Sequence, residues 1–161
     1  MLNNISIKHL VNILFFFLLG LIALILSVFV LSKEKLVNGQ FWVAHTHEVI
    51  AQSNAFLSRM IDAETGQRGF ILTLEEGYLE PYKQGIKETH KNFSHLKSLT
   101  SDNPRQQERL NSINLLMEDK FSELKQTINL ASNNQRDEAL IIIKGNSGKA
   151  AMDSIRALLV A

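Results

Sequence analysis

Apolar residues recur at seven-residue spacing along the first half of the chain and predict one long helix. Trp42 begins a column that continues with Val49, Phe56, Ala63 and Phe70, and a second column beside it holds Val43, Ile50 and Leu57. Two adjacent columns at this spacing form the apolar stripe of an amphipathic helix. No proline interrupts residues 33–73, so we expect a helix of about 60 Å at 1.5 Å per residue.

Three further stretches with the same periodicity follow. The second stripe consists of Tyr82, Ile86, Phe93 and Leu96 and ends near Leu99, where Asp102-Asn103-Pro104 predicts the end of one helix and the start of the next. The third helix carries a heptad seam made of Leu110, Ile113, Met117, Phe121, Leu124, Ile128 and Ala131. The last stretch ends in an amphipathic segment with Met152, Ile155 and Leu159.

Polar residues between these stretches predict the links. Thr73 to Glu76 has the pattern of a capping box, and Gly77 and Pro81 predict a short kinked turn after it. Asn133-Asn134 ends the third helix, and we expect Asn134 to cap the next one together with Asp137. Residues 144–148 interrupt that last helix. The sequence therefore predicts an all-α, up-down-up-down four-helix bundle with a long first helix.

Residues 13–31 are apolar except for Gly20 and Ser27, which predicts a transmembrane helix over residues 10–31 after a short N-terminus, 1–9. The run is longer than the apolar region of a signal peptide and lacks a small-residue cleavage site, so we expect an uncleaved anchor. Lys8 precedes the run, whereas Lys33 and Lys35 follow it, so the positive charges leave the orientation open. The predicted helical domain is residues 33–161.

Charge and composition exclude several function classes. All 16 acidic residues and 16 of the 17 lysines and arginines follow the apolar run, so no net charge steers nucleic acid to this part. The absence of cysteine excludes disulfides and thiolate chemistry. The histidine pairs 45/47 and 90/95 lack the spacing of helical metal ligands, and residues 145–149 are a helix break, not a phosphate loop. We expect no metal, no cofactor and no catalytic site.

The unusual stretch is Asp62 to Phe70, which places charges and two glycines inside a helical pattern. Glu64 continues an apolar column, and Arg68 one turn later is its local partner. Gly66 and Gly69 indicate that another helix approaches closely. Two readings stay open, a polar helix crossing and a ligand-contacting site. Tyr78 and Tyr82, one turn apart, anchor the bundle end or line a small-molecule cleft.

Four motifs in order resemble a known family: Asp62-Ala-Glu-Thr-Gly-Gln-Arg-Gly-Phe-Ile-Leu-Thr73, Tyr78-Leu-Glu-Pro-Tyr82, Asp102-Asn-Pro with Gln107, and Met152-Asp-Ser-Ile-Arg156. They are similar to the third type of CHASE domain, the cyclase/histidine-kinase-associated sensory extracellular domain. The resemblance implies an extracytoplasmic helical sensor between two membrane helices of a bacterial receptor. It places the N-terminus in the cytoplasm and the helical domain outside the inner membrane, truncated before a second membrane helix.

The resemblance and the residues together give our functional expectation. We expect a membrane-anchored sensory input domain of a histidine kinase, diguanylate cyclase or chemoreceptor, which transmits an unknown small-molecule or protein signal by helix displacement and forms a homodimer. The alternative is a bitopic structural bundle that self-associates without a ligand; an enzyme is the least favoured class. The expected polar core consists of Asp62, Glu64, Thr65, Gly66, Arg68, Gly69, Asp153 and Arg156.

Antiparallel packing should bring the two ends of this set together. The last helix descends past the break at residues 145–148, which brings Asp153 and Arg156 toward the level of Arg59 and Asp62. We therefore predict an ion pair between Asp62 and Arg156, with Asp153 directed toward Arg59 or Arg68.

Overall fold

The computed structural model describes the backbone of residues 7–160 and the side chains of residues 9–33 and 39–160. The described residues form helices joined by short links, without a strand. The helices are α1 (Ile7–Thr73), the single-turn η1 (Glu76–Tyr78), α2 (Leu79–Leu99), α3 (Pro104–Ser132), α4 (Arg136–Lys144) and α5 (Ser147–Val160). The chain divides into two units, Met1–Thr46 and His47–Ala161.

The first unit contains the apolar run. His9–Lys33 is long and apolar enough to cross a membrane by length and composition, and none of its residues is buried within the protein. The run belongs to α1, which continues to Thr73 as predicted.

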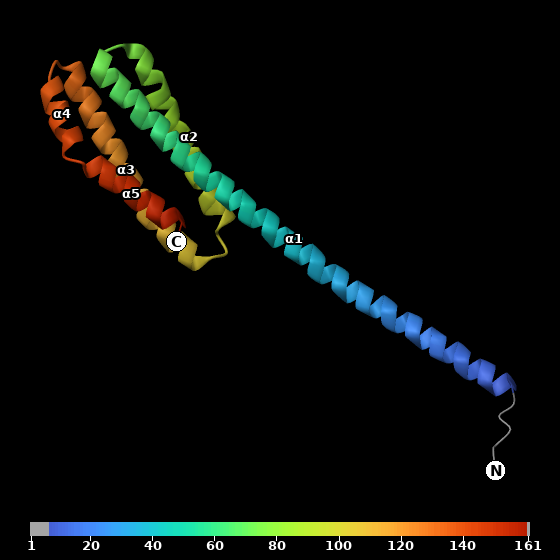
Figure 1. The fold of residues 1–161 in the computed structure, drawn as a ribbon. Coiled ribbons are helices and arrows are strands. Elements are labelled where there is room, and N and C mark those ends of the chain that lie inside the picture. Colours follow the sequence, from blue (N-terminus) through green and yellow to red (C-terminus); the bar gives the residue numbers. More distant parts are fainter. Residues whose placement is uncertain (1–6, 161) are drawn as a thin grey trace. The chain divides into compact units, whose positions relative to one another are not determined.

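The second unit is a four-helix bundle whose fourth arm is divided into α4 and α5 (Figure 1). Its main core contains Phe56, Met60, Phe93, Met117 and Ile155, and a smaller core near the α1–α2 turn contains Phe70, Ile71 and Ile128. All seven residues of the predicted α3 seam are buried. The seam prediction is confirmed. The predicted α1 stripe is buried at Phe56, Ala63 and Phe70 and half-buried at Val49 and Leu57, whereas Trp42, Val43 and Ile50 are exposed.

The helix ends follow local chemistry, with two corrections. Asn103 caps α3 by accepting a hydrogen bond from the Gln106 N–H (3.2 Å), and Pro104 occupies the first turn, as predicted. The prediction of a capping box at Thr73 is wrong. Thr73 is the last residue of α1, and its hydroxyl accepts from the Glu75 N–H (3.1 Å), because Leu74 turns the chain with a φ of 60°.

Asn134 does not cap α4. It adopts a φ of 63°, a left-handed conformation that asparagine tolerates, and it follows the end of α3. The Gln135 N–H donates to the Leu130 carbonyl (2.9 Å) and the Asn134 N–H to the Ala131 carbonyl (3.2 Å), the two bonds of a Schellman motif. This asparagine therefore satisfies carbonyls of the preceding helix.

Candidate functional site

The stretch Asp62 to Phe70 presents alternating faces of α1 to different surroundings. Ala63, Gly66, Gln67 and Phe70 are buried, whereas Thr65 and Arg68 are exposed. The buried face explains why small and apolar residues occur here.

Glycines allow η1 and α2 to approach α1 closely. A Cβ atom on Gly66 would lie 2.7 Å from both the Tyr78 carbonyl oxygen and the Tyr82 nitrogen, and one on Gly69 would overlap the Tyr78 ring. The predicted close approach is confirmed, and the residues that approach α1 belong to η1 and to the start of α2.

A third glycine on α2, which the sequence reasoning missed, extends the same contact. A Cβ atom on Gly85 would lie 2.7 Å from the Ala63 nitrogen and 2.8 Å from the Arg59 carbonyl oxygen. The available signal was the position of Gly85 on the α2 stripe, between Tyr82 and Thr89.

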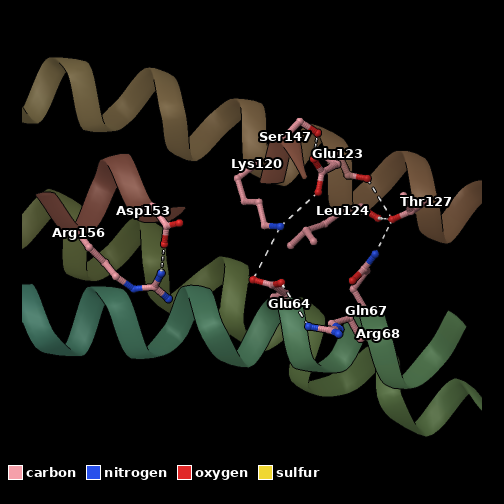
Figure 2. A network of polar contacts seen from close by, with 10 residues as sticks. All are labelled: Glu64, Gln67, Arg68, Lys120, Glu123, Leu124, Thr127, Ser147, Asp153 and Arg156. Atoms are coloured by element: carbon pink, nitrogen blue, oxygen red, sulfur yellow. Dashed lines mark hydrogen bonds and ion pairs between the residues drawn. The ribbon is translucent and has the colours of Figure 1, made fainter. Parts of the chain in front are cut away.

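A buried lysine on α3 is the centre of the site (Figure 2). The side chain of Lys120 is only 4% exposed, and its Nζ lies 3.2 Å from Glu123 Oε1 and 3.7 Å from Glu64 Oε2 on α1. At the start of α5, the Ser147 hydroxyl donates to Glu123 Oε2 (2.6 Å). We call Glu64, Lys120, Glu123 and Ser147 the Lys120 clasp; it connects α1, α3 and α5.

The backbone of α5 completes the clasp. A Cβ atom on Gly148 would overlap Glu123 Oε1 and Lys120 Nζ, so the first turn of α5 lies directly against the charged ends of these two side chains. A carboxylate beside a helix N-terminus is stabilised by the helix dipole. Glu123 therefore supplies the negative charge that both Lys120 and the start of α5 favour.

The sequence reasoning identified Glu64 but not its main partner. Arg68 Nη1 lies 3.9 Å from Glu64 Oε1, and its side chain is 64% exposed, so the buried cation is Lys120. Lys120 lies seven residues after Ile113, which belongs to the α3 seam, and seven residues before the buried Thr127. This position on the inward face was the signal for its burial.

A second polar contact between α1 and α3 lies next to the clasp. Gln67 donates to the Thr127 hydroxyl at 2.7 Å, and both side chains are buried. The Thr127 hydroxyl can in turn donate to the Leu124 carbonyl oxygen at 2.9 Å. Buried polar groups with partners fix the register of two helices, since any sliding leaves them unpaired.

The predicted pairing of Asp62 with Arg156 is wrong. Asp62 pairs with Arg59 (3.0 Å), and Arg156 pairs with Asp153 (2.8 Å), which also contacts Lys149 (2.6 Å). Each charge meets a partner three or four residues away on its own helix, the spacing at which side chains are neighbours. Hydrogen bonding to Lys149 lowers the pKa of the Asp153 carboxyl, with a further lowering by Arg156. Asp153 is therefore not directed toward Arg59 or Arg68.

The two tyrosines have different surroundings. Tyr78 is 40% exposed and lies against Gly69, whereas Tyr82 packs against both core clusters. Burial raises the pKa of the Tyr82 hydroxyl. Among the described residues, one surface cavity of about 260 Å³ lies between α1 and α2 at Arg59, Asp62, Thr65 and Gln84, and another of the same volume lies beside the clasp. No tyrosine lines either of these cavities.

Comparison with known families identifies this arrangement. Residues 40–161 match the model of the CHASE3 domain, which covers most of the chain. The chain belongs to the CHASE3 domain family. The match includes all the clasp residues and both cavities, and CHASE3 is a sensory domain, so the bundle is a sensory input domain of a signalling receptor.

The CHASE3 bundle has the fold of a solved sensor domain. It is similar to the Rhodopseudomonas palustris histidine kinase HK9 sensor domain, with a TM-score of 0.66 and 24% identity over 71% of this chain and 89% of that chain. A search of curated proteins found no match.

The two histidines on α2 lie near carboxylates on neighbouring helices. His90 Nδ1 lies 3.8 Å from Glu118 Oε1, and His95 Nε2 lies 3.7 Å from Glu48 Oε1, with all four side chains about half exposed. Among the described residues, no group of three or more His, Cys, Asp or Glu side chains is arranged to hold a metal ion.

Proposed function

We propose that this CHASE3 domain is the extracytoplasmic input domain of a bacterial inner-membrane receptor and transmits its signal by displacement of α1 relative to α5. The observation that carries the proposal is the Lys120 clasp, in which one buried ammonium connects Glu64 on α1 with Glu123, the partner of Ser147 on α5. The helix that carries Glu64 also carries the apolar run.

The energetics of buried ion pairs suit a switching contact. Desolvation offsets most of the attraction within such a pair, yet removing one partner costs ~3–5 kcal/mol because a buried charge is left alone. A signal that draws Glu64 away from Lys120 must therefore be matched by a new position of α1, such as the axial shifts of about 1–2 Å that occur between packed helices.

Spin labels test the displacement directly. The chain contains no cysteine, so Asn54→Cys on α1 and Ala157→Cys on α5, both at exposed positions, give a single labelled pair in the full chain in detergent micelles. We expect Glu64→Gln to shift the label-to-label distance by about 1–2 Å. Glu108→Gln, at an exposed position on α3 without an ion pair among the described residues, is the control. An unchanged distance in Glu64→Gln contradicts the mechanism.

The sidedness and partner of the domain form part of the same proposal. An extracytoplasmic bundle requires Asn54→Cys to react with a membrane-impermeant maleimide in intact cells, and protection of that thiol contradicts it. The exposed residues Phe41, Trp42 and Val43 on α1 support a homodimer, because exposed apolar side chains favour association. Light scattering of the full chain in micelles measures the mass of the protein assembly and so tests the dimer.

We also propose that the domain is not catalytic and that an output module of histidine kinase, diguanylate cyclase or chemoreceptor type belongs to the whole receptor. The charged groups of the clasp support this reading, because each of its carboxylates is already engaged by the Lys120 ammonium or the Ser147 hydroxyl. A fusion to a histidine kinase output would show signalling that depends on Glu64 if the proposal holds.

A further inference from the structure

A cavity lies beside the Lys120 clasp, where α4 and α5 meet α3. It has a volume of about 260 Å³, and its wall includes Asp119, Lys120, Ser122 and Glu123 of α3 and Ser147 and Ala151 of α5. At ~30 Å³ per water molecule, this space equals about nine waters. A ligand that fits has about ten non-hydrogen atoms or fewer. We call this space the break cavity.

One end of the break cavity favours a cation. Asp119 and Glu123 are four residues apart on α3 and both line the cavity, an arrangement in which like charges repel. Asp119 forms no ion pair with any described residue, and Lys120 is shared between Glu123 and Glu64. Asp119 is exposed to solvent and has no cation beside it among the described residues, so an ammonium group placed between the two carboxylates would relieve their repulsion.

The other side of the cavity offers unused hydrogen-bond donors. A lysine ammonium has three N–H groups. Among the described residues, Lys120 forms a hydrogen bond only with Glu123, because the 3.7 Å between its Nζ and Glu64 Oε2 exceeds hydrogen-bond length. This side chain is only 4% exposed, so solvent is a poor acceptor for its remaining N–H groups. A carboxylate oxygen of a ligand can supply the missing acceptor.

We propose that the break cavity binds a small amino-acid-like zwitterion, with its ammonium at Asp119 and Glu123 and its carboxylate at Lys120. Ser122 supplies a hydroxyl group to its polar substituents, and the Ser147 hydroxyl, which donates to Glu123, can accept a hydrogen bond from them. A free anion fits less well, because the Glu123 carboxylate already lies against the first turn of α5. The inference rests on the proposed sensory function and names its ligand class. A bound carboxylate competes with Glu64 for Lys120 and so acts on α1.

Titration calorimetry on the full chain in detergent micelles tests the proposal with glycine, L-serine, L-threonine and L-glutamine as probes. We expect at least one to bind. Asp119→Asn should then weaken its binding tenfold or more, since one charge-assisted hydrogen bond is worth ~1.5–3 kcal/mol. Ala151→Leu should abolish binding by filling the cavity. Glu118→Gln is the matched control, because it removes the same charge one residue away and does not line the cavity.

Three results overturn the proposal: no probe binds, Asp119→Asn and Ala151→Leu bind like the wild type, or acetate or methylammonium alone binds as tightly as the zwitterion. Neither variant removes a clasp residue. The spin-label experiment provides the separate readout for the proposed function. A helix shift in Glu64→Gln without binding of any probe refutes the zwitterion proposal and keeps the displacement mechanism. Probe binding without a helix shift keeps the zwitterion proposal and refutes the displacement mechanism.

Discussion

Replacing Lys120 with methionine should destabilise the bundle strongly, although methionine is apolar and of similar length. The substitution leaves the Glu64 and Glu123 carboxylates, only 28% and 13% exposed, without their shared cation. Breaking a buried pair in this way costs ~3–5 kcal/mol. Because Glu64 retains partial contact with solvent and with Arg68 at 3.9 Å, we expect the lower end, about 3 kcal/mol.

Urea denaturation of the full chain in micelles, followed by far-ultraviolet circular dichroism, measures this loss. For a slope of ~2 kcal/mol per molar urea, the midpoint should fall by about 1.5 M. Lys125→Met is the matched control, since it makes the same change at an exposed position of α3 and should stay within about 0.5 kcal/mol of the wild type. A Lys120→Met midpoint equal to that of the control refutes the buried ion pair.

A triple variant separates lost charge balance from lost packing. Lys120→Met combined with Glu64→Gln and Glu123→Gln removes all three charges, and replacement of a whole buried ion cluster by neutral groups is often neutral or stabilising. We expect its stability to return to within about 1 kcal/mol of the wild type. If the triple variant is as unstable as Lys120→Met, the loss comes from packing and the electrostatic reasoning is wrong.

Three further results are expected from the same unfolding assay. Gly85→Ala should lower stability by about 1–2 kcal/mol, because the added Cβ meets the backbone of α1 at Ala63 and the overpacking exceeds the gain in helix propensity. Gly77→Ala, which has open space around it, should not lower stability. Equal effects of the two substitutions would contradict the close approach of α1 and α2. Asn103→Ala should cost about 1 kcal/mol through the lost cap of α3, and no loss would mean that Pro104 alone defines the helix start. The pKa of Tyr82 is raised in the folded state, so its contribution to stability is complete below the ordinary tyrosine pKa and is lost as the pH rises through the folded pKa. Tyr82→Phe should therefore reduce the loss of stability at alkaline pH. If stability falls as steeply with pH in Tyr82→Phe as in the wild type, other groups cause the loss.

The sequence by itself predicted the helices and most of their ends, because these depend on residues close together in the chain. The α3 seam and the Asn103-Pro104 start are visible as spacing and as local capping chemistry, and the structure confirms both. Asn134 was misassigned because asparagine serves two roles, as an N-cap and as a left-handed residue after a helix, and the choice depends on which carbonyls lie within reach.

Only the tertiary structure decided which polar groups meet between helices. Asp62 and Arg156 were matched by their approximate level in the bundle, yet each found a partner one turn away on its own helix. Lys120 reaches Glu64 because α1 and α3 pack in one particular register and rotation. One residue of a helix adds 1.5 Å and turns it by about 100°, so an error of a single residue in register changes every such pair, whereas an apolar stripe tolerates it.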